Sequence, residues 1–272
     1  MTNVAIDVRL TETALWQWQT WQGLPYLTCN LLEDWSHGFF TRHYYPQTPE
    51  AFTGALGANV PVYRVKQVHG DRLLNPQGIT NPEIAEADGI ITDASGQGIW
   101  VASADCTPVL IGDRSTGVGV AIHSGWRGTA KGIVVKAVKQ LLNSGSCLDN
   151  LVLALGPAIA GEVYQVDREV AAEVGLSLFP QETNPDQILA NLFNLSPSPL
   201  FADEEKGKVR LDVRRVIYHQ LQQLGIRDQQ IAIAPFCTYQ QEEHFFSYRR
   251  EKMLLLLIGT KRSDRNLLIS NS

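Results

Sequence analysis

The stretch VGVAIHSGWRGTAKGIVVKAVKQLLN, residues 118–143, passes from a strand pattern through a glycine-containing turn into a helix pattern. Its first part, Val118–His123, is rich in β-branched residues and ends at a turn. From Thr129 to Asn143 apolar residues recur at helical spacing, with Thr129 placed to cap the start and Gly145 to end the helix. The stretch therefore predicts a strand over 118–123 and a helix over 129–143.

Similar patterns on both sides of this stretch indicate the fold class. Further strands are predicted at Val62–Val68, Gly89–Thr92, Ile99–Ala102, Val109–Ile111, Leu151–Leu155, Ile231–Ala234 and Met253–Ile258. Two more helices are predicted: Asp212–Leu224, with Gly225 as its stop, and Arg168–Val174, capped by Asp167. Residues 180–205, rich in Pro, Asn, Ser and acids, are interpreted as an excursion or lid. Strands outnumber helices without strict alternation, so we expect an α+β fold with mixed sheets.

Composition favours a small-molecule partner. The chain has 272 residues and no linker between two periodic halves, so we expect one domain over 1–272. Its net charge is -5 and it has no long basic run, which argues against nucleic acid or a membrane surface as partner. The N-terminus lacks a signal-peptide pattern and no apolar run approaches the roughly 20 residues of a membrane span. We therefore expect a cytoplasmic protein, without disulfides among its 4 cysteines.

Three metal-capable side chains stand where apolar strands meet loops: His69 in Gln67-Val68-His69-Gly70, Cys106 after Asp105, and His123 before Ser124. Two imidazoles and a thiolate suit Zn²⁺, and three protein ligands leave a fourth tetrahedral position open for chemistry. The spacing alone does not force the three together. Separate roles, as a loop histidine, a core thiol and a buried strand-end histidine, remain open at this point.

Other residues near these segments suit a substrate. Ser124 and Arg127 lie in the turn that leads into the long helix, where an anion such as phosphate can bind. The turn also fits a simple tight connection, because it is not a Walker loop. Asp88 and Asp105 can each orient a ligating histidine, bind a substrate or cap a turn. Arg249, in Phe245-Phe246-Ser247-Tyr248-Arg249-Arg250, is a candidate to bind a planar base with its ribose or phosphate, while surface arginines beside a core aromatic pair are the alternative.

Six segments together resemble one known family: Lys66–Gly70, Ala87–Thr92, Ala104–Val109, Ala121–Gly128, Leu155–Ile159 and Phe246–Arg250. This is the YfiH-like, laccase-domain family of purine nucleoside phosphorylases. The match runs from about residue 37 to 250 in the family's order. The resemblance implies a four-layer αββα-type domain and a zinc ion held by His69, Cys106 and His123, which also makes these residues catalytic.

The resemblance also implies an activity. It is phosphorolysis of adenosine, guanosine, inosine and methylthioadenosine, with hydrolytic deamination of adenosine. Purine nucleosides and phosphate are then the partners, and a monomer or weak homodimer the expected state. The substrate-binding residues we expect are Arg127, Ser124, Asp105 and Arg249. Two departures from the family pattern put substrate range in doubt: residues 42–46 read Arg-His-Tyr-Tyr-Pro, and the usual Gly-Arg pair beyond Arg250 is missing.

Three other functions remain possible from the sequence. A copper-dependent polyphenol oxidase would fit the family's laccase label and Cu²⁺ at the same ligands, but the histidine-rich clusters of multicopper enzymes are not seen. A metal-free hydrolase would use Cys106 as nucleophile and His123 as base. A non-enzymatic peptidoglycan-editing protein would bind a nucleotide-linked ligand tightly without turnover.

Overall fold

The structure is a computed structural model that describes residues 14–57, 60–81 and 85–251. Its α-helices are α2 (Pro49–Phe52), α3 (Trp126–Ala130), α4 (Ile133–Asn143), α5 (Arg168–Gly175), α6 (Pro185–Asn194) and α7 (Val213–Gln223). Its strands are β1 (Trp16–Trp21), β2 (Leu24–Cys29), β3 (Phe39–Phe40), β4 (Val62–Tyr63), β5 (Leu73–Leu74), β6 (Gly89–Ile91), β7 (Gly98–Ile99), β8 (Thr107–Asp113), β9 (Gly119–Ser124), β10 (Leu151–Leu155), β11 (Gln165–Asp167), β12 (Leu200–Ala202), β13 (Lys208–Leu211) and β14 (Ile231–Ile233).

The central sheet has six strands in the order β14-β10-β8-β9-β6-β5. Strands β10 and β14 run parallel, as do β5 and β6, whereas β10, β8, β9 and β6 pair in antiparallel fashion. This sheet is mixed, which confirms the α+β class. In the register of β8 and β9, Pro108 pairs with His123. Cys106 lies two residues before Pro108, so the chain brings it close to the end of β9 that carries His123.

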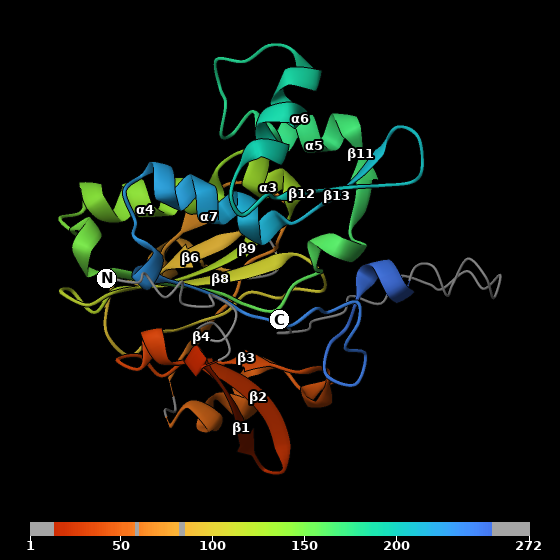
Figure 1. Ribbon diagram of the computed structural model, residues 1–272. Coiled ribbons are helices and arrows are strands. Elements are labelled where there is room, and N and C mark those ends of the chain that lie inside the picture. The colour runs from red at the N-terminus through yellow and green to blue at the C-terminus, as the bar shows by residue number, and fades with distance from the viewer. Residues whose placement is uncertain (1–13, 58–59, 82–84, 252–272) are drawn as a thin grey trace, which may run out of the picture.

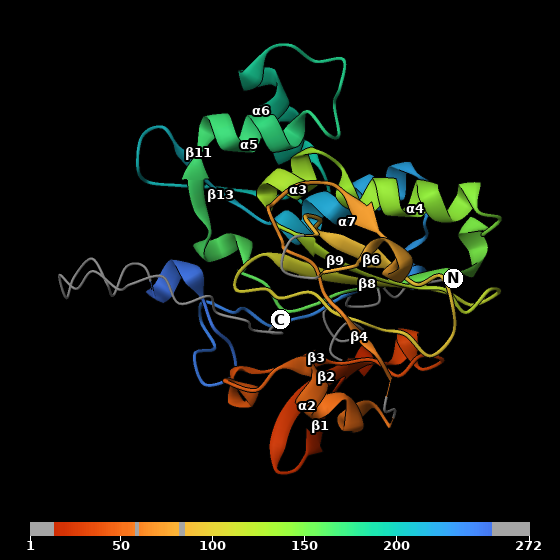
Figure 2. The same ribbon diagram turned by 180° about the vertical axis from the view of Figure 1, so that it is seen from behind.

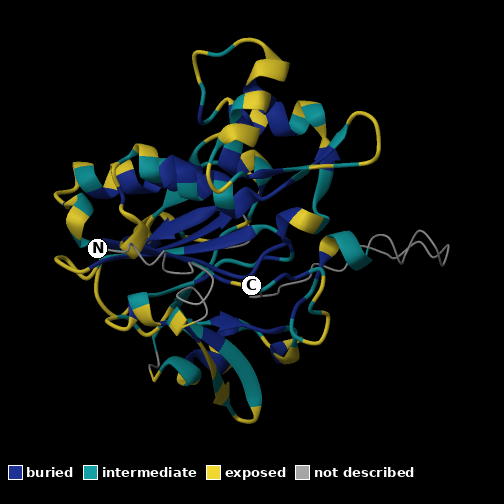
Figure 3. Cartoon of the chain, viewed as in Figure 1, coloured by how far each residue is buried: buried dark blue, intermediate teal, exposed yellow. Residues whose placement is uncertain are grey.

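The two faces of the central sheet face different layers (Figure 1). Successive side chains of a strand point to opposite faces. In β10, residues 151, 153 and 155 join the core formed with helices α4, α5, α6 and α7, and residues 152 and 154 join a second core with the sheet β1-β2-β3. Figure 3 shows the strands of the central sheet as a largely buried layer between these two neighbours.

The small sheet is two-sided in the same way. Leu27 and Phe39 face the central sheet, whereas Tyr26 and Phe40 pack with Phe52 of α2 and with Trp100. Helix α2 lies on the outer side of β1 and β2 when the molecule is seen from behind (Figure 2). Helices, central sheet, small sheet and α2 thus form four successive layers, which confirms the expected arrangement.

The prediction of one helix over 129–143 was wrong at its start. The chain forms α3 over Trp126–Ala130 and then breaks at Gly132, whose φ is 70°, before α4 begins at Ile133. Thr129 lies inside α3 and does not cap α4. A left-handed residue cannot continue a right-handed helix, and glycine adopts this conformation at little cost. The predicted end was correct, because Gly145 follows the helix with φ 101°.

The other helix predictions had mixed outcomes. Helix α7 begins after Asp212, whose side chain accepts from the Arg215 amide at 3.2 Å as a cap should. Helix α5 begins at Arg168 as expected, but Asp167 makes no side-chain cap and instead accepts from Lys208 Nζ at 2.7 Å. Residues 180–205 are not a bare excursion: they contain α6 and β12, and three buried residues of α6 (Ile188, Leu189 and Leu192) enter the main core.

The strands predicted within the described residues are present: β10 has its predicted bounds, β8 is longer than predicted, and the others are shorter or shifted by one residue. The strand predicted at 62–68 is reduced to β4, and the one predicted at 99–102 is reduced to Ile99 at the end of β7. The prediction for Met253–Ile258 lies outside the described residues. Among the residues that are described, no helix is long and apolar enough to cross a membrane.

Candidate metal centre

The tertiary structure brings His69, Cys106 and His123 together. One ligand atom from each lies within 4.8 Å of the other two, and the two imidazole rings have centroids 4.8 Å apart. His69 stands in the loop between β4 and β5, Cys106 in the bend before β8, and His123 in β9. His123 is 4% exposed, whereas His69 is open to solvent. The cluster is therefore anchored in the core on one side and accessible on the other.

Asp88 organises two of the three ligands. Its Oδ1 accepts from His123 Nδ1 and from the His69 amide, both at 2.9 Å. Its Oδ2 accepts from the amides of Val68 at 3.2 Å and Gly70 at 2.6 Å. Asp88, which is 0% exposed, therefore both orients a ligating histidine and caps the turn that carries the other, two roles that the sequence left as alternatives.

The Asp88 bond also selects the histidine tautomer. Because His123 donates its Nδ1 proton to the carboxylate, Nε2 is the nitrogen that carries the lone pair when the ring is neutral, which is the form that binds a metal. His69 is held differently: its φ of 57° places it in the left-handed region, where the Asp88 contacts with the surrounding amides fix the turn. The His123 ring and the backbone turn of His69 are thus fixed before any ion binds.

The electrostatics of the cluster favour an ionised thiol. Burial opposes ionisation of Cys106, but hydrogen bonds and charge from His123 and His69 outweigh it and lower its pKa to about 7. Burial likewise opposes protonation of His123, yet Asp88 and Cys106 raise its pKa to about 9. Burial works against the charge of Asp88 too, and the bonds from His123 and the loop amides still lower its pKa. A thiolate at neutral pH is the form in which cysteine binds a metal.

Two neighbouring residues set the spacing of the three segments. A Cβ on Gly125 would lie 2.6 Å from Cys106 Sγ and 3.3 Å from His69 Cδ2, so only glycine leaves room for the cluster. Gln67 ties the His69 loop to the segment before Cys106, because its Nε2 donates to the Ala102 carbonyl and its Oε1 accepts from the Ala102 amide, both at 2.7 Å. Gln67 was part of the motif quoted for His69, but no role was predicted for it.

The four predicted substrate-binding residues differ in placement. Arg127 is exposed, with its guanidinium carbon 4.2 Å from the Trp126 ring centroid. Ser124 is buried and shares a hydrogen bond of 2.8 Å with the Thr129 hydroxyl. Arg127 can therefore meet a ligand directly, while the Ser124 hydroxyl already has a protein partner.

Asp105 and Arg249 are joined to each other. The Arg249 amide donates to Asp105 Oδ2 at 2.7 Å, and the guanidinium of Arg249 donates to the Gln165 carbonyl at 3.0 Å. Arg250 is different: it donates to the carbonyls of Thr238, Tyr239 and Phe245 and so holds its own segment together.

Tyr164 is a site residue that the sequence analysis missed. The guanidinium carbon of Arg249 lies 5.0 Å from the centroid of its ring. Burial, together with the charge of Cys106, raises the pKa of Tyr164 to about 12, although the charges of Arg249 and Arg127 lower it. The phenol is therefore within electrostatic range of the Cys106 thiol and of both arginines. Only its place after the Gly156-Pro157 turn could have drawn attention to it.

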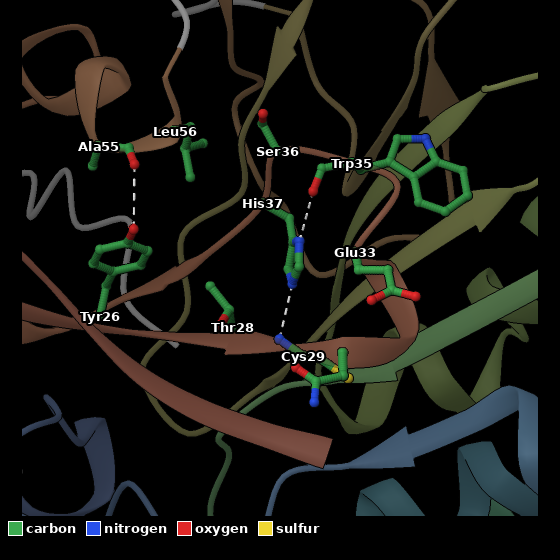
Figure 4. A pocket seen from close by; sticks show the side chains of 10 residues that line it. Tyr26, Thr28, Cys29, Glu33, Trp35, Ser36, His37, Ala55 and Leu56 are labelled. Carbon is green, nitrogen blue, oxygen red and sulfur yellow. Dashed lines mark hydrogen bonds between the residues drawn. The ribbon is translucent and has the colours of Figure 1, made fainter.

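A separate cavity of about 270 Å³ lies beside β2 (Figure 4). His37 forms part of its wall: its Nε2 accepts from the Cys29 amide at 2.8 Å and its Nδ1 donates to the Trp35 carbonyl at 2.9 Å. Burial lowers the pKa of His37, which favours the neutral ring. None of the candidate ligands lines this cavity.

The donor set fits a zinc ion. Zinc bonds of roughly 2.0–2.3 Å in a tetrahedron place ligand atoms roughly 3.5 Å apart, which is compatible with a cluster confined to 4.8 Å. Two imidazoles and a thiolate are borderline-soft donors suited to zinc, and the set also suits copper.

Comparisons with known proteins show the family of the chain. Residues 47–259 match the family described as multi-copper polyphenol oxidoreductase laccase. The chain belongs to this family. A purine nucleoside phosphorylase of Synechocystis sp. is 52% identical over 244 residues, which cover 87% of this chain and 92% of that protein.

Two solved structures share the fold. YlmD from Geobacillus stearothermophilus superposes with a TM-score of 0.71 at 22% identity, over 86% of this chain and 94% of that one. YfiH from Bacillus licheniformis gives a TM-score of 0.68 at 22% identity, over 84% of this chain and 91% of that one. The expected YfiH-like membership is confirmed.

Proposed function

We propose that the chain is a zinc-dependent purine nucleoside phosphorylase that also deaminates adenosine. The observation that carries the proposal is the convergence of His69, Cys106 and His123 into one half-open cluster. The relatives named purine nucleoside phosphorylase support the reaction class. Adenosine, guanosine, inosine and methylthioadenosine are the proposed substrates, with inorganic phosphate, and a cytoplasmic monomer or weak homodimer over 1–272 is the proposed form.

Each residue of the site has a proposed task. His69, Cys106 and His123 would hold the ion, with Asp88 fixing the His123 tautomer. When bound, zinc supplies Lewis-acid chemistry that activates water or orients phosphate. Arg127 would contribute positive charge at the exposed rim.

Among the other proposed residues, Arg249 would add charge beside Tyr164, while Asp105 and Ser124 would act from within the wall of the site. Both buried groups already have protein partners, so their contribution to substrate binding would come through the residues they hold.

One alternative has a specific observation in its favour. His123 contacts both the Cys106 thiol and the Asp88 carboxylate, which is the order of a cysteine–histidine–aspartate hydrolase. In that case chelation would leave activity intact and thiol alkylation would abolish it. His69 argues for the metal, since a hydrolase triad has no need of a second imidazole at the sulfur.

A multicopper oxidase is less well supported. Within residues 14–57, 60–81 and 85–251, the cluster at His69 is the one group of three or more metal-capable side chains close enough to share an ion. Multicopper oxygen reduction requires additional copper sites. Elemental analysis for zinc and copper separates the two proposals.

The decisive experiment is a product assay with adenosine, with and without phosphate and with and without a strong chelator. We expect chelator-sensitive adenine and ribose 1-phosphate, inosine as the deamination product, and about one zinc per chain. His69→Ala and Cys106→Ala should lose both metal and activity, whereas Cys147→Ala, at an exposed cysteine outside the cluster, should keep both. Full zinc retention in the first two variants would refute the ligand assignment.

A second variant tests the phosphate role. Arg127→Ala should weaken phosphorolysis, by raising KM for phosphate, more than it weakens deamination, which needs no phosphate. Equal loss of both activities would indicate that Arg127 has a structural role instead.

A further inference from the structure

Asp105 has an unusual conformation next to a metal ligand. Its φ is 85°, in the left-handed region that residues with side chains rarely adopt, and it directly precedes Cys106. Its side chain is almost fully buried, with 8% exposure. A strained and buried carboxylate persists only where surrounding contacts hold it, so its partners indicate its role.

Those partners all come from one distant segment. Asp105 Oδ1 accepts from the Thr238 hydroxyl at 2.7 Å, and Oδ2 accepts from the Ser247 hydroxyl at 3.0 Å and from the Arg249 amide at 2.7 Å. The three donors are 133 to 144 residues away in sequence. One carboxylate therefore fastens the segment 238–249 to the loop of Cys106.

Cys106 itself does not depend on this carboxylate. Its carbonyl accepts a hydrogen bond from the Ser103 hydroxyl, and the next residue, Thr107, enters the β8–β9 pairing opposite Ser124. The Asp105 carbonyl, not its side chain, accepts from the Ile159 amide at 3.0 Å. Loss of the carboxylate should thus leave the Cys106 thiol in place and release the segment 238–249.

The segment 238–249 carries Arg249. With its amide fixed by Asp105, its guanidinium reaches the Gln165 carbonyl and packs 5.0 Å from the Tyr164 ring centroid. Cation–π contacts and a fixed backbone both limit where a flexible arginine can stand. The charge of Arg249 is therefore held in a defined place near the cluster.

We propose that Asp105 is a positioning residue: it binds no substrate itself, but holds Arg249 against the Tyr164 ring and beside the metal-ligand loop, so that the Arg249 guanidinium can hold the phosphate substrate. This rests on the proposed phosphorylase function for its kinetic consequence. The fixation of the 238–249 segment does not rest on it, and can be measured separately.

The test variant is Asp105→Asn, because asparagine also tolerates positive φ and keeps one acceptor oxygen. The matched control is Asp113→Asn, which removes a buried carboxylate at the far end of β8, where Asp113 Oδ1 accepts from Ser115. We expect Asp105→Asn to keep about one zinc per chain and to raise KM for phosphate about ten-fold, with kcat changed less than about three-fold. Asp113→Asn should lower the melting temperature and leave KM unchanged. A wild-type KM, or loss of zinc, in Asp105→Asn would overturn the proposal.

A double variant tests whether Asp105 acts through Arg249. If it does, adding Asp105→Asn to Arg249→Ala should raise KM for phosphate by less than a further factor of about two, because the side chain that Asp105 positions is already gone. If the two KM effects multiply in full, Asp105 acts by another route and the proposal fails.

Amide hydrogen exchange gives a readout that needs no activity. In the zinc-loaded protein, Asp105→Asn should speed exchange in peptides covering 238–249, and Asp113→Asn should not. If the wild-type protein shows no phosphorolysis but exchange changes as expected, the proposed function fails and the fastening role stands. If exchange in 238–249 is unchanged, the positioning proposal fails whatever the activity.

Discussion

Asp88→Asn is the sharpest single perturbation of this site. In the structure each carboxylate oxygen accepts two hydrogen bonds: Oδ1 those of His69 and His123, and Oδ2 those of Val68 and Gly70. An asparagine can keep the hydrogen bonds of only one of the two oxygens. Its amide nitrogen replaces the other oxygen and is itself a donor, so it cannot accept from the two donors there. Two charge-assisted hydrogen bonds, worth roughly 1.5–3 kcal/mol each, are lost. The free energy of unfolding should therefore fall by about 3 to 6 kcal/mol.

Metal affinity should fall whichever way the amide turns. With its nitrogen toward His123, the imidazole is driven to the tautomer that protonates Nε2, which cannot bind an ion. With its nitrogen toward Val68 and Gly70, the turn that carries His69 loses two of the three hydrogen bonds that hold it. Loss of such a supporting hydrogen bond typically weakens metal binding roughly 10- to 100-fold.

Two assays measure these effects. Zinc affinity is obtained by competition between apo protein and a fluorescent chelator, and stability by urea unfolding of the apo form, where bound zinc cannot mask the change. Asp113→Asn serves as control, with reduced stability and unchanged zinc affinity. A zinc affinity for Asp88→Asn within about three-fold of wild type would refute the argument that this carboxylate orients the ligands.

Three other predictions follow from the geometry. Gly125→Ala should lose zinc binding, because its Cβ would lie 2.6 Å from Cys106 Sγ, whereas Gly78→Ala, whose Cβ meets only a leucine methyl at 3.6 Å, should bind zinc normally in the same titration. In the apo protein, iodoacetamide labelling of Cys106 should rise with pH around a midpoint near its pKa of about 7 and be blocked by zinc, and a midpoint above 8.5 would contradict the thiolate assignment. Burial opposes the charge of Asp113, but its bonds from Ser115 lower its pKa to about 2, so its contribution to stability is full above pH 4 and is lost as pH falls toward 2. Acid unfolding of Asp113→Asn should therefore be less steep than that of wild type between pH 4 and 2.

Several local elements followed from the sequence because their signals are local. Strand β10 has the predicted bounds of Leu151–Leu155, and α7 begins directly after Asp212, where the helix was predicted to start. Strands β1 and β2 were absent from the predictions, although Trp16–Trp21 alternates Trp and Gln as a half-buried strand does. The break at Gly132 was also missed, since a glycine inside a helical pattern is compatible with either continuation or a left-handed break.

The roles of Asp88 and Asp105 could not be predicted from local sequence. Asp88 and Asp105 both stand beside apolar strands, and the sequence offered the same roles for each. Asp88 turned out to face His123 and the His69 turn, and Asp105 to face the segment 238–249. Likewise Arg249 packs on Tyr164 whereas Arg250 binds backbone carbonyls, and nothing in the pair Arg249-Arg250 distinguishes them.

The sequence by itself determined the donor types, their places at strand ends, and the family. Periodicity and turn chemistry act over a few residues, and the laccase-family motifs are contiguous. The family resemblance implied that His69, Cys106 and His123 share one site, and the tertiary structure places them together. Only the tertiary structure decided that Asp88 and Gln67 hold the loops of this site and that Asp105 binds the segment of Arg249 beside it. Those contacts join residues 18 to 144 positions apart, and which of several equivalent polar groups meet across such distances is set by strand register and core packing, which no short stretch encodes.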